Sequence, residues 1–271
     1  MSVSDDLAQS LSGLAKRVRR LEKFHFASSA EIDSQIYARA RADSIAMKLA
    51  LPQLRGFWPF SSTNDVRTII DQAGAGRHLQ AVGSPTFSST ENNAPYGMTS
   101  GSGQAWVRAT ENGLNVVGAL TFGLWFYTND LTSNKYVMSK WTTSGDQRGW
   151  YMTVVPTSGL ITFAGSSDGI TQEIALVNFD SPVVVGGWTF AVARFIESVS
   201  ASLFVNNISS IFTTSIPSTL FSNTAALMIN GVNGGNYLTN GGFAQAFLCA
   251  AALSDQVIED MFENDRVLFG V

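Results

Sequence analysis

The side chains able to act as acids, bases or nucleophiles are few and scattered in this sequence. Of its two histidines, His25 lies in an N-terminal region of helical pattern, and His78 follows Arg77 at a predicted strand start. No nucleophile-elbow motif accompanies them, so a Ser-His-Asp hydrolase is not indicated. The dense carboxylates, Glu259-Asp260 and Glu263-Asn-Asp265, fall on or just after a predicted C-terminal helix, where a solvated face explains them.

Metal and redox chemistry are not indicated either. The single cysteine, Cys249, cannot form an intramolecular disulfide, and it lies in an apolar run where a buried, inert thiol is expected. No Cys/His spacing fits a zinc site, and no glycine-rich phosphate loop precedes a helix. We therefore expect a non-enzymatic protein, with no catalytic residues, no metal site and no cofactor.

Aromatic residues beside polar turns are the remaining candidates for a site. An aromatic face can stack on a sugar ring while Asn, Asp and Arg side chains bind its hydroxyl groups. Trp106 and Trp150 also qualify by type, but a core position is the favoured interpretation for Trp150 in Gly149-Trp-Tyr151. The predicted shallow sugar site consists of Trp141, Asp146, Arg148, Asn233, Asn236 and Tyr237.

Short β-rich runs must position these residues. Of the 271 residues, 45% are hydrophobic and 14% charged, which is typical of a core-forming chain. Turn signals rich in Gly, Asn, Ser and Asp recur between apolar runs without intervening helices, which predicts an all-β antiparallel sandwich of two sheets. A short helix capped by Ser254 should follow, with a buried stripe that includes Met261 and Phe262. The clearest predicted strands are Val117–Tyr127, Tyr136–Trp141, Gly149–Val155, Thr189–Phe195, Ala201–Val205 and Phe243–Ala250.

The first fifty residues have a different, helical pattern. Leucine and valine recur there at steps of 4, 3, 4 and 3, which predicts a short coiled coil. Arg17-Val18-Arg19-Arg20-Leu21-Glu22 resembles the Arg/Glu-flanked signature of trimeric coiled coils. A dimer, or an amphipathic helix lying on the chain's own sandwich, remains open as an alternative. A second helix should run from about Ser29 to Ala50. The predicted oligomerisation residues are Leu7, Leu11, Leu14, Arg17, Val18, Leu21 and Glu22.

Charge is distributed unevenly along the chain. Residues 1–55 hold nine Lys and Arg against six acids, about +3, and the rest holds eight against fifteen, −7. The N-terminal bases alternate with apolar residues at helical spacing, so we expect no binding to nucleic acid. The N-terminus lacks the pattern of a secretory signal, and no apolar run approaches the roughly 18 residues of a membrane span. We expect synthesis in a host cytoplasm and no membrane insertion.

Several segments resemble, in order, the laminin-G-like members of the concanavalin A-like lectin/glucanase superfamily. They are Gly56–Phe60, Ile70–Gly76, Leu120–Phe126, Val137–Trp141, Gly187–Val192, Ala201–Asn206 and Asn240–Ile258. The resemblance implies a jelly-roll sandwich over residues 54–271, carried on a helical stalk at residues 1–50. Related sandwiches include retaining glycosidases, but their Glu-x-Asp-x-Glu strand is absent here. Some members bind calcium; Asp71 lies in the matching turn without an accompanying carboxylate cluster.

A helical stalk followed by a sandwich is the layout of viral fibre and adhesion proteins. It predicts a homotrimeric bacteriophage virion protein, whose residues 1–50 dock onto other virion proteins and whose sandwich binds a host-surface glycan or protein. A capsid or tail decoration protein with a purely structural role is the main alternative. A carbohydrate-binding module of a cellular protein is the second.

Overall fold

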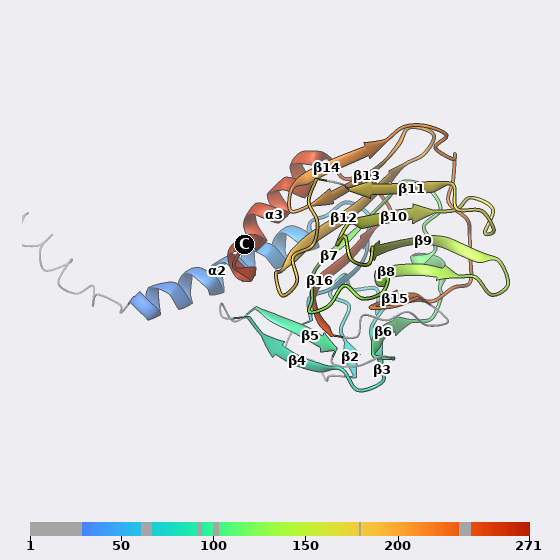
Figure 1. The fold of residues 1–271 in the computed structure, drawn as a ribbon. Coiled ribbons are helices and arrows are strands. Elements are labelled where there is room, and N and C mark those ends of the chain that lie inside the picture. Colours follow the sequence, from blue (N-terminus) through green and yellow to red (C-terminus); the bar gives the residue numbers. More distant parts are fainter. Residues whose placement is uncertain (1–28, 61–66, 91–93, 100–102, 179, 233–239) are drawn as a thin grey trace, which may run out of the picture. The chain divides into compact units, whose positions relative to one another are not determined.

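The computed structural model describes residues 29–60, 67–90, 94–99, 103–178, 180–232 and 240–271 (Figure 1). The predicted coiled-coil residues Leu7 to Glu22 lie outside the described residues, as do Asn233, Asn236 and Tyr237 of the predicted sugar site. The chain divides into two compact units, residues 1–39 and residues 40–271. The boundary falls within helix α2 (Ser29–Leu49), about ten residues before the predicted end of the stalk.

Among the described residues, the second unit contains two eight-stranded sheets in which every strand pair is antiparallel (Figure 1). The predicted all-β sandwich is thus confirmed. The first sheet consists of β14 (Ile208–Phe212), β13 (Ser200–Val205), β12 (Thr189–Ile196), β7 (Leu120–Thr128), β16 (Gly241–Cys249), β5 (Pro95–Thr99) and β4 (Thr86–Ser89), with β1 (Leu54–Trp58) also paired to β16. The second consists of β11 (Ile174–Asn178), β10 (Ile161–Gly165), β9 (Gln147–Val154), β8 (Lys135–Thr142), β15 (Leu227–Ile229), β6 (Ala105–Arg108), β3 (Leu79–Val82) and β2 (Thr68–Ile69), and a single 3-10 turn, η1 (Asn112–Leu114), follows β6.

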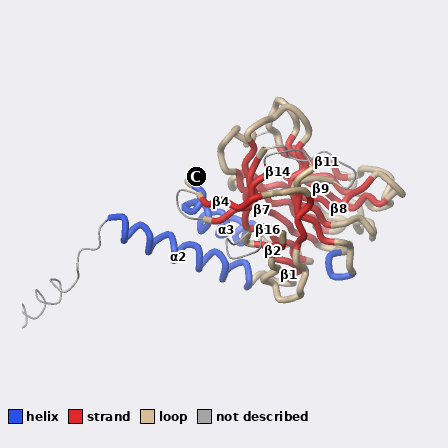
Figure 2. Tube along the Cα trace, turned by 90° about the horizontal axis from the view of Figure 1, so that it is seen from below, coloured by secondary structure: helices blue, strands red, loops and turns tan. Residues whose placement is uncertain are grey.

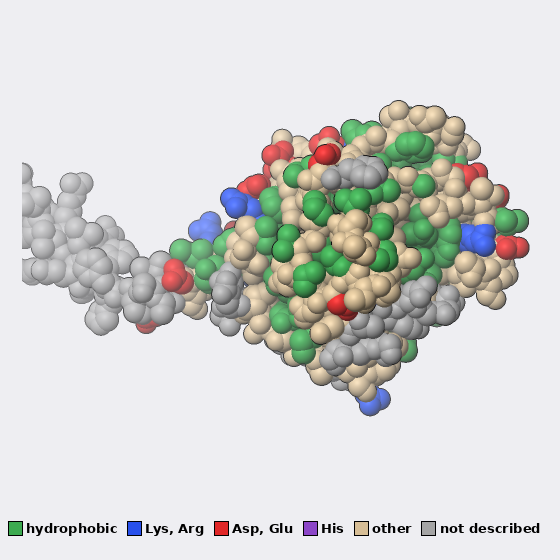
Figure 3. Space-filling model, in the orientation of Figure 1, with side chains coloured by type: hydrophobic (Ala, Val, Ile, Leu, Met, Phe, Trp, Pro, Cys, Tyr) green, Lys and Arg blue, Asp and Glu red, His purple; other side chains and the backbone are tan. Residues whose placement is uncertain are grey.

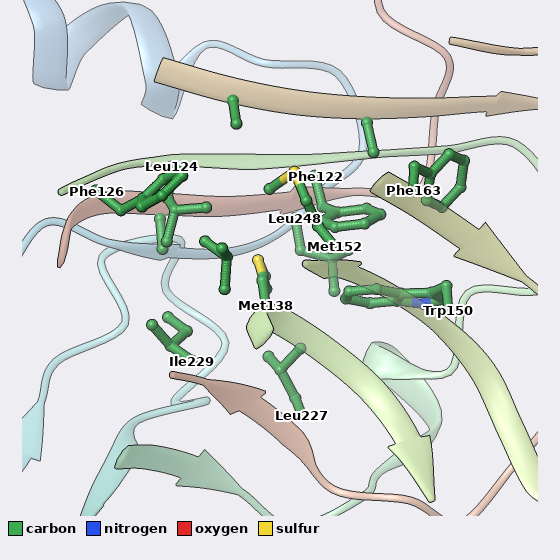
Figure 4. Close-up of a cluster of buried hydrophobic side chains, with 14 of the residues drawn as sticks. Phe122, Leu124, Phe126, Met138, Trp150, Met152, Phe163, Leu227, Ile229 and Leu248 are labelled. Carbon is green, nitrogen blue, oxygen red and sulfur yellow. The ribbon is translucent and has the colours of Figure 1, made fainter. Parts of the chain in front are cut away.

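The core lies between the two sheets (Figure 4). Because side chains alternate along a strand, every second residue of β7 and β9 points into this layer. Phe122 of β7 meets Trp150 of β9 there, with ring centroids 4.0 Å apart. Trp106 and Trp150 are both buried, which confirms the core interpretation of Trp150.

A helix covers the outer face of the first sheet (Figure 2). In α3 (Asp255–Phe269), the Ser254 hydroxyl caps the N-terminus by accepting from the Val257 N–H, and Gly270 ends the helix in the left-handed conformation. Two phenylalanines of α3 stack on Trp125 of β7, with centroid distances of 5.9 Å for Phe262 and 4.4 Å for Phe269. Burial from both sides explains why β7 is apolar almost throughout, as the sequence pattern indicated.

The last residues of α2 also contact this covered face. The Lys48 ammonium donates to the Asp265 carboxylate at 2.5 Å, and the Trp125 indole N–H donates to the same oxygen at 3.0 Å. Ser44 donates to Gln245, which stands at a bulge of β16 with φ of 51°. Burial lowers the pKa of Lys48, and the attraction of Asp265 opposes that shift. Residues 40–49 therefore contribute polar contacts to the unit that holds the sandwich.

Neither helix in the described part of the chain combines the length and apolarity needed to cross a membrane.

Candidate functional site

The outer face of the second sheet is hollowed by a pocket of about 370 Å³. Its lining comes from β8, β9, the turn that joins them, and the loop between β10 and β11. We call this the Trp141 pocket; it is lined by Tyr136, Trp141, Thr143, Arg148, Tyr151, Ile170 and Gln172. Its volume is at the small end of the roughly 300–1,000 Å³ typical of ligand sites, which suits one or two sugar rings.

A bulge in β9 turns Arg148 toward this pocket. Lys140 pairs with Trp150 and the next residue, Trp141, pairs with Arg148, so Gly149 is an extra residue in β9. A bulge of this kind re-aims the side chain beside it, and it brings Arg148 to the same face as its cross-strand neighbour Trp141. Glycine is required here because a Cβ at position 149 would lie 2.3 Å from the Asn223 amide nitrogen and 2.8 Å from the Lys140 carbonyl oxygen.

A second bulge, in β8, places Tyr136 on the face of the sheet that carries the pocket. Tyr136 pairs with Thr153 and Met138 with Met152, which leaves Val137 as the extra residue. Val137 and Met138 can then both enter the core, and Tyr136 is left on the outer face. The two bulges together decide which side chains of this hairpin face the pocket.

Three aromatic rings form one connected surface in the pocket. Tyr151 is central and makes edge-to-face contacts with Tyr136 at 5.0 Å and with Trp141 at 4.9 Å between centroids. The Tyr151 hydroxyl donates to the Gln172 side-chain oxygen at 3.0 Å, which ties this surface to the β10–β11 loop. Trp141 is 6% exposed and Tyr151 9%, so the rings are held rigidly with only part of each accessible.

The loop of residues 166–173 forms one wall and is fixed by its own carboxylates. Asp168 accepts from the backbone N–H groups of Thr171 and Ile170 at 2.7 Å each and from the Thr171 hydroxyl, so its pKa lies well below its usual range. Glu173 binds the backbone N–H and hydroxyl of Ser167 at the start of the loop. These bonds hold Ile170, which is 54% exposed, at the pocket edge.

Arg148 is the one charged residue in the pocket lining that the structure describes. Burial raises the pKa of Tyr151 to about 12, with a contribution from Tyr136, and burial also raises the pKa of Tyr136. Both phenols are therefore neutral at physiological pH. The pocket combines an aromatic surface, hydroxyl and amide groups, and one positive charge, which is a set suited to holding a polar ring compound.

The structure brings together two of the predicted site residues, Trp141 and Arg148. Asp146 lies in the exposed β8–β9 turn with φ of 54°, outside the pocket lining. Its carbonyl oxygen instead packs against Gly169, where a Cβ would approach it to 2.4 Å. Asp146 is therefore not among the described residues that line the Trp141 pocket, although it lies two positions from Arg148 in the sequence.

Tyr136, Tyr151 and Gln172 were missed by the sequence prediction. For Tyr151 a signal exists, because it stands between Trp150 and Met152, two inward-facing residues of one strand. The residue between them must point outward. A large aromatic residue at an outward position of a strand is a better indicator of a site than one beside a turn.

The other candidates take structural roles among the described residues. The Asp71 carboxylate accepts three backbone N–H bonds, from Phe57, Ala73 and Arg77 at 2.9–3.1 Å, and so organises a turn. No cluster of three or more His, Cys, Asp or Glu suited to a metal ion is found in the described part of the chain. Cys249 is fully buried, and burial raises the pKa of its thiol to about 12.

A family model described as the concanavalin A-like lectin/glucanases superfamily matches residues 100–259. The chain belongs to this superfamily. The match covers the strands from β7 to β16 and therefore includes the whole Trp141 pocket. It confirms the resemblance seen in the sequence segments.

Solved structures of superfamily domains resemble this chain at low sequence identity. The binding domain of Paraclostridial Mosquitocidal Protein 1 has a TM-score of 0.63 at 12% identity, covering 78% of this chain and 52% of that one. The botulinum neurotoxin serotype D ligand binding domain, in complex with N-acetylneuraminic acid, has a TM-score of 0.61 at 10% identity, covering 81% and 52%. This chain spans about half the length of these structures, which establish a shared fold. No curated protein sequence matches.

Proposed function

We propose that this chain is a non-enzymatic binding protein whose sandwich holds a saccharide in the Trp141 pocket. The observation that carries the proposal is the connected surface of Tyr136, Trp141 and Tyr151 on the outer face of the second sheet. An aromatic surface beside hydrogen-bonding groups matches the two sides of a sugar ring, one apolar and one polar. The structurally similar toxin structures are described as binding domains, which is consistent with the proposal.

The polar groups around the rings would orient the sugar. Thr143 offers a hydroxyl, Gln172 an amide group and Arg148 a guanidinium. None of these acts as a base or nucleophile at neutral pH, so the pocket is suited to binding and not to cleaving a glycosidic bond. The described residues of the lining include no Asp or Glu, which supports the same conclusion.

We also propose that the N-terminal segment, residues 1–50, assembles three chains and attaches them to a virion. An open pocket of this size binds one sugar weakly, and three heads on one stalk would gain avidity without any new contact. A bacteriophage adhesion protein fits this layout. A decoration protein would be expected to present a flat face matched to its neighbours, so the aromatic pocket favours adhesion.

A glycan array probed with the full chain tests the binding proposal. Two variants change the pocket: Trp141→Ala removes the largest ring, and Ile170→Asp alters the exposed rim. Ile211→Asp is a matched control, because Ile211 is 56% exposed on β14 of the other sheet and Ile170 is 54% exposed.

We expect the wild type and Ile211→Asp to bind the same glycans, and both pocket variants to lose roughly tenfold or more in affinity. Circular dichroism on each variant confirms folding before binding is scored. Absence of glycan binding by the wild type, or equal binding by folded pocket variants, would overturn the proposal and favour a structural role.

A further inference from the structure

Arg148 has no carboxylate partner among the residues that the structure describes, and the same is true of Arg55 in β1. Four others are paired with carboxylates: Arg77 and Arg108 with Glu111, Arg194 with Asp255, and Arg266 with Glu263. The Arg148 guanidinium makes no hydrogen bond or ion pair with any residue that the structure describes, although its backbone N–H donates to the Gly169 carbonyl oxygen at 3.3 Å. Its main chain is therefore held while its charged group stays available.

The carboxylates closest along the chain form no ion pair with the Arg148 guanidinium. Asp168 and Glu173 are occupied by hydrogen bonds within their own loop. Asp146 lies outside the lining and forms no ion pair with Arg148. Tyr136 and Tyr151 are neutral, since burial raises both of their pKa values. The described lining thus carries one positive charge, which has no ion-pair partner among the described residues, beside three aromatic rings.

We propose that the saccharide held in the Trp141 pocket is acidic and that its carboxylate pairs with the Arg148 guanidinium. This rests on the proposed function, and it names the class of sugar: a uronic or sialic acid, in place of a neutral hexose. A guanidinium presents two parallel N–H donors that match the two oxygens of a carboxylate. In a partly buried site such a charge-assisted bond is stronger than one between neutral groups.

The charge of the pocket favours a carboxylate over a phosphate ester. A phosphate carries about −1.5 to −2 at pH 7 and three acceptor oxygens, and protein sites for it usually add a helix N-terminus or further cations. The described lining includes one cation, and all of its residues lie on strands, turns or loops. One positive charge matches the single negative charge of a sugar acid.

The test compares acidic sugars with neutral counterparts, using saturation-transfer NMR with the full chain. The pairs are methyl glucuronide against methyl glucoside, and 3′-sialyllactose against lactose. Arg148→Gln removes the positive charge. Arg148→Lys keeps the charge but lacks the two parallel N–H donors of the guanidinium. Arg266→Gln, which changes the net charge equally on the exposed surface of α3, is the control.

We expect the wild type and Arg266→Gln to prefer the acidic member of a pair by about tenfold or more, and Arg148→Gln to lose that preference. Arg148→Lys should retain part of it, because the charge remains. The preference should also weaken with added salt.

The outcomes separate this inference from the proposed function. If acidic and neutral sugars bind equally, and Trp141→Ala abolishes both, then the pocket binds sugar and the acid assignment is wrong. If the acidic preference survives in Arg148→Gln, the role of Arg148 is wrong. If no sugar binds to the wild type or Arg266→Gln, the proposed function itself fails.

Discussion

The outer faces of the two sheets differ in how their charged groups are paired. On the first sheet, α3 and the end of α2 cover the strands, and a lysine–aspartate pair is sealed beneath them. On the second sheet, the corresponding face carries an aromatic pocket whose arginine has no partner among the described residues. The Lys48 charge on the first face is therefore paired within the chain, whereas the Arg148 guanidinium on the second face has no ion-pair partner among the described residues. The space-filling view shows few charged side chains around the middle of the visible surface (Figure 3).

Two of the three buried lysines among the described residues, Lys48 and Lys140, are held in different ways, and the third, Lys135 of β8, pairs with Asp130. Lys48, on the covered face, pairs with the Asp265 carboxylate. Lys140, in the second sheet, donates to four neutral oxygens, which belong to Thr110, Asn223 and Ala225 at 2.8–3.1 Å. Burying a charge is costly unless it is paired or fully hydrogen-bonded. Lys48 is therefore held by a charge partner, and Lys140 by hydrogen bonds to neutral groups.

The largest effect should come from breaking the pair on the covered face. Asp265→Asn leaves Lys48 charged, buried and unpaired, so we expect the free energy of unfolding to fall by about 3–5 kcal/mol. Denaturant unfolding measures this. Glu263→Gln is the control: its carboxylate also pairs with an arginine, Arg266, but both side chains are about half exposed, and a loss within about 1 kcal/mol is expected. The double change Lys48→Met/Asp265→Leu should recover most of the loss. A cost for Asp265→Asn no larger than that of the control would refute the sealed-pair account.

A smaller effect is expected at the bulge that shapes the open face. Gly149→Ala forces a Cβ against Asn223 and the Lys140 carbonyl, so we expect about 1–3 kcal/mol of destabilisation by the same unfolding assay. Because the bulge aims Arg148, glycan affinity should fall as well, even under conditions where the variant is folded. Gly145→Ala is the comparison, since nothing lies within 4 Å of its added Cβ, although φ is 69° there. Unchanged stability and affinity in Gly149→Ala would mean that the bulge does not constrain the pocket.

The pH dependence of stability should report the burial of Lys140. Burial lowers the pKa of Lys140 from 10.5 to about 8. Between pH 8 and 10.5 the unfolded chain then keeps a proton that the folded chain has lost, so this group makes unfolding harder as pH rises. Relative to Lys140→Met, the wild-type free energy of unfolding should rise across this window, by at most about 1.4 kcal/mol per pH unit. Parallel curves for the two proteins would show that the four hydrogen bonds hold the lysine charged throughout.

The smallest effect should be at Arg148. Its guanidinium has no partner among the described residues, so Arg148→Gln should change the free energy of unfolding by no more than about 0.5 kcal/mol. Thermal unfolding followed by circular dichroism measures this. A large destabilisation would mean that Arg148 supports the fold, and it would remove the argument that the guanidinium is kept for a ligand.

Local patterns predicted the fold well. The runs read as strands at Thr189–Phe195 and Ala201–Val205 correspond to β12 and β13 within one residue at each end. The Ser254 cap of α3 was also readable, since a cap needs only neighbouring residues. By contrast, β2 and β15 have two and three residues, too few for any periodicity to show.

The site was harder to predict because bulges decide it. Trp141 and Arg148 were found by residue type, but their shared face depends on the extra residue Gly149, and no alternation rule reveals that. Tyr151 was readable as an outward residue, whereas Gln172 joins it through a loop twenty-one residues away. The contact of Lys48 with Asp265 joins residues 217 positions apart, so the sequence pattern assigned the end of α2 to the stalk alone.

Hydrogen–deuterium exchange tests most directly whether the open face is the binding face. The full chain would be measured with and without the glycan that binds best on the array. We expect added protection in residues 135–142, 147–154 and 166–173, which surround the Trp141 pocket, and unchanged exchange in α3 and β14. Protection confined to α3 or to the strands of the first sheet would contradict the account.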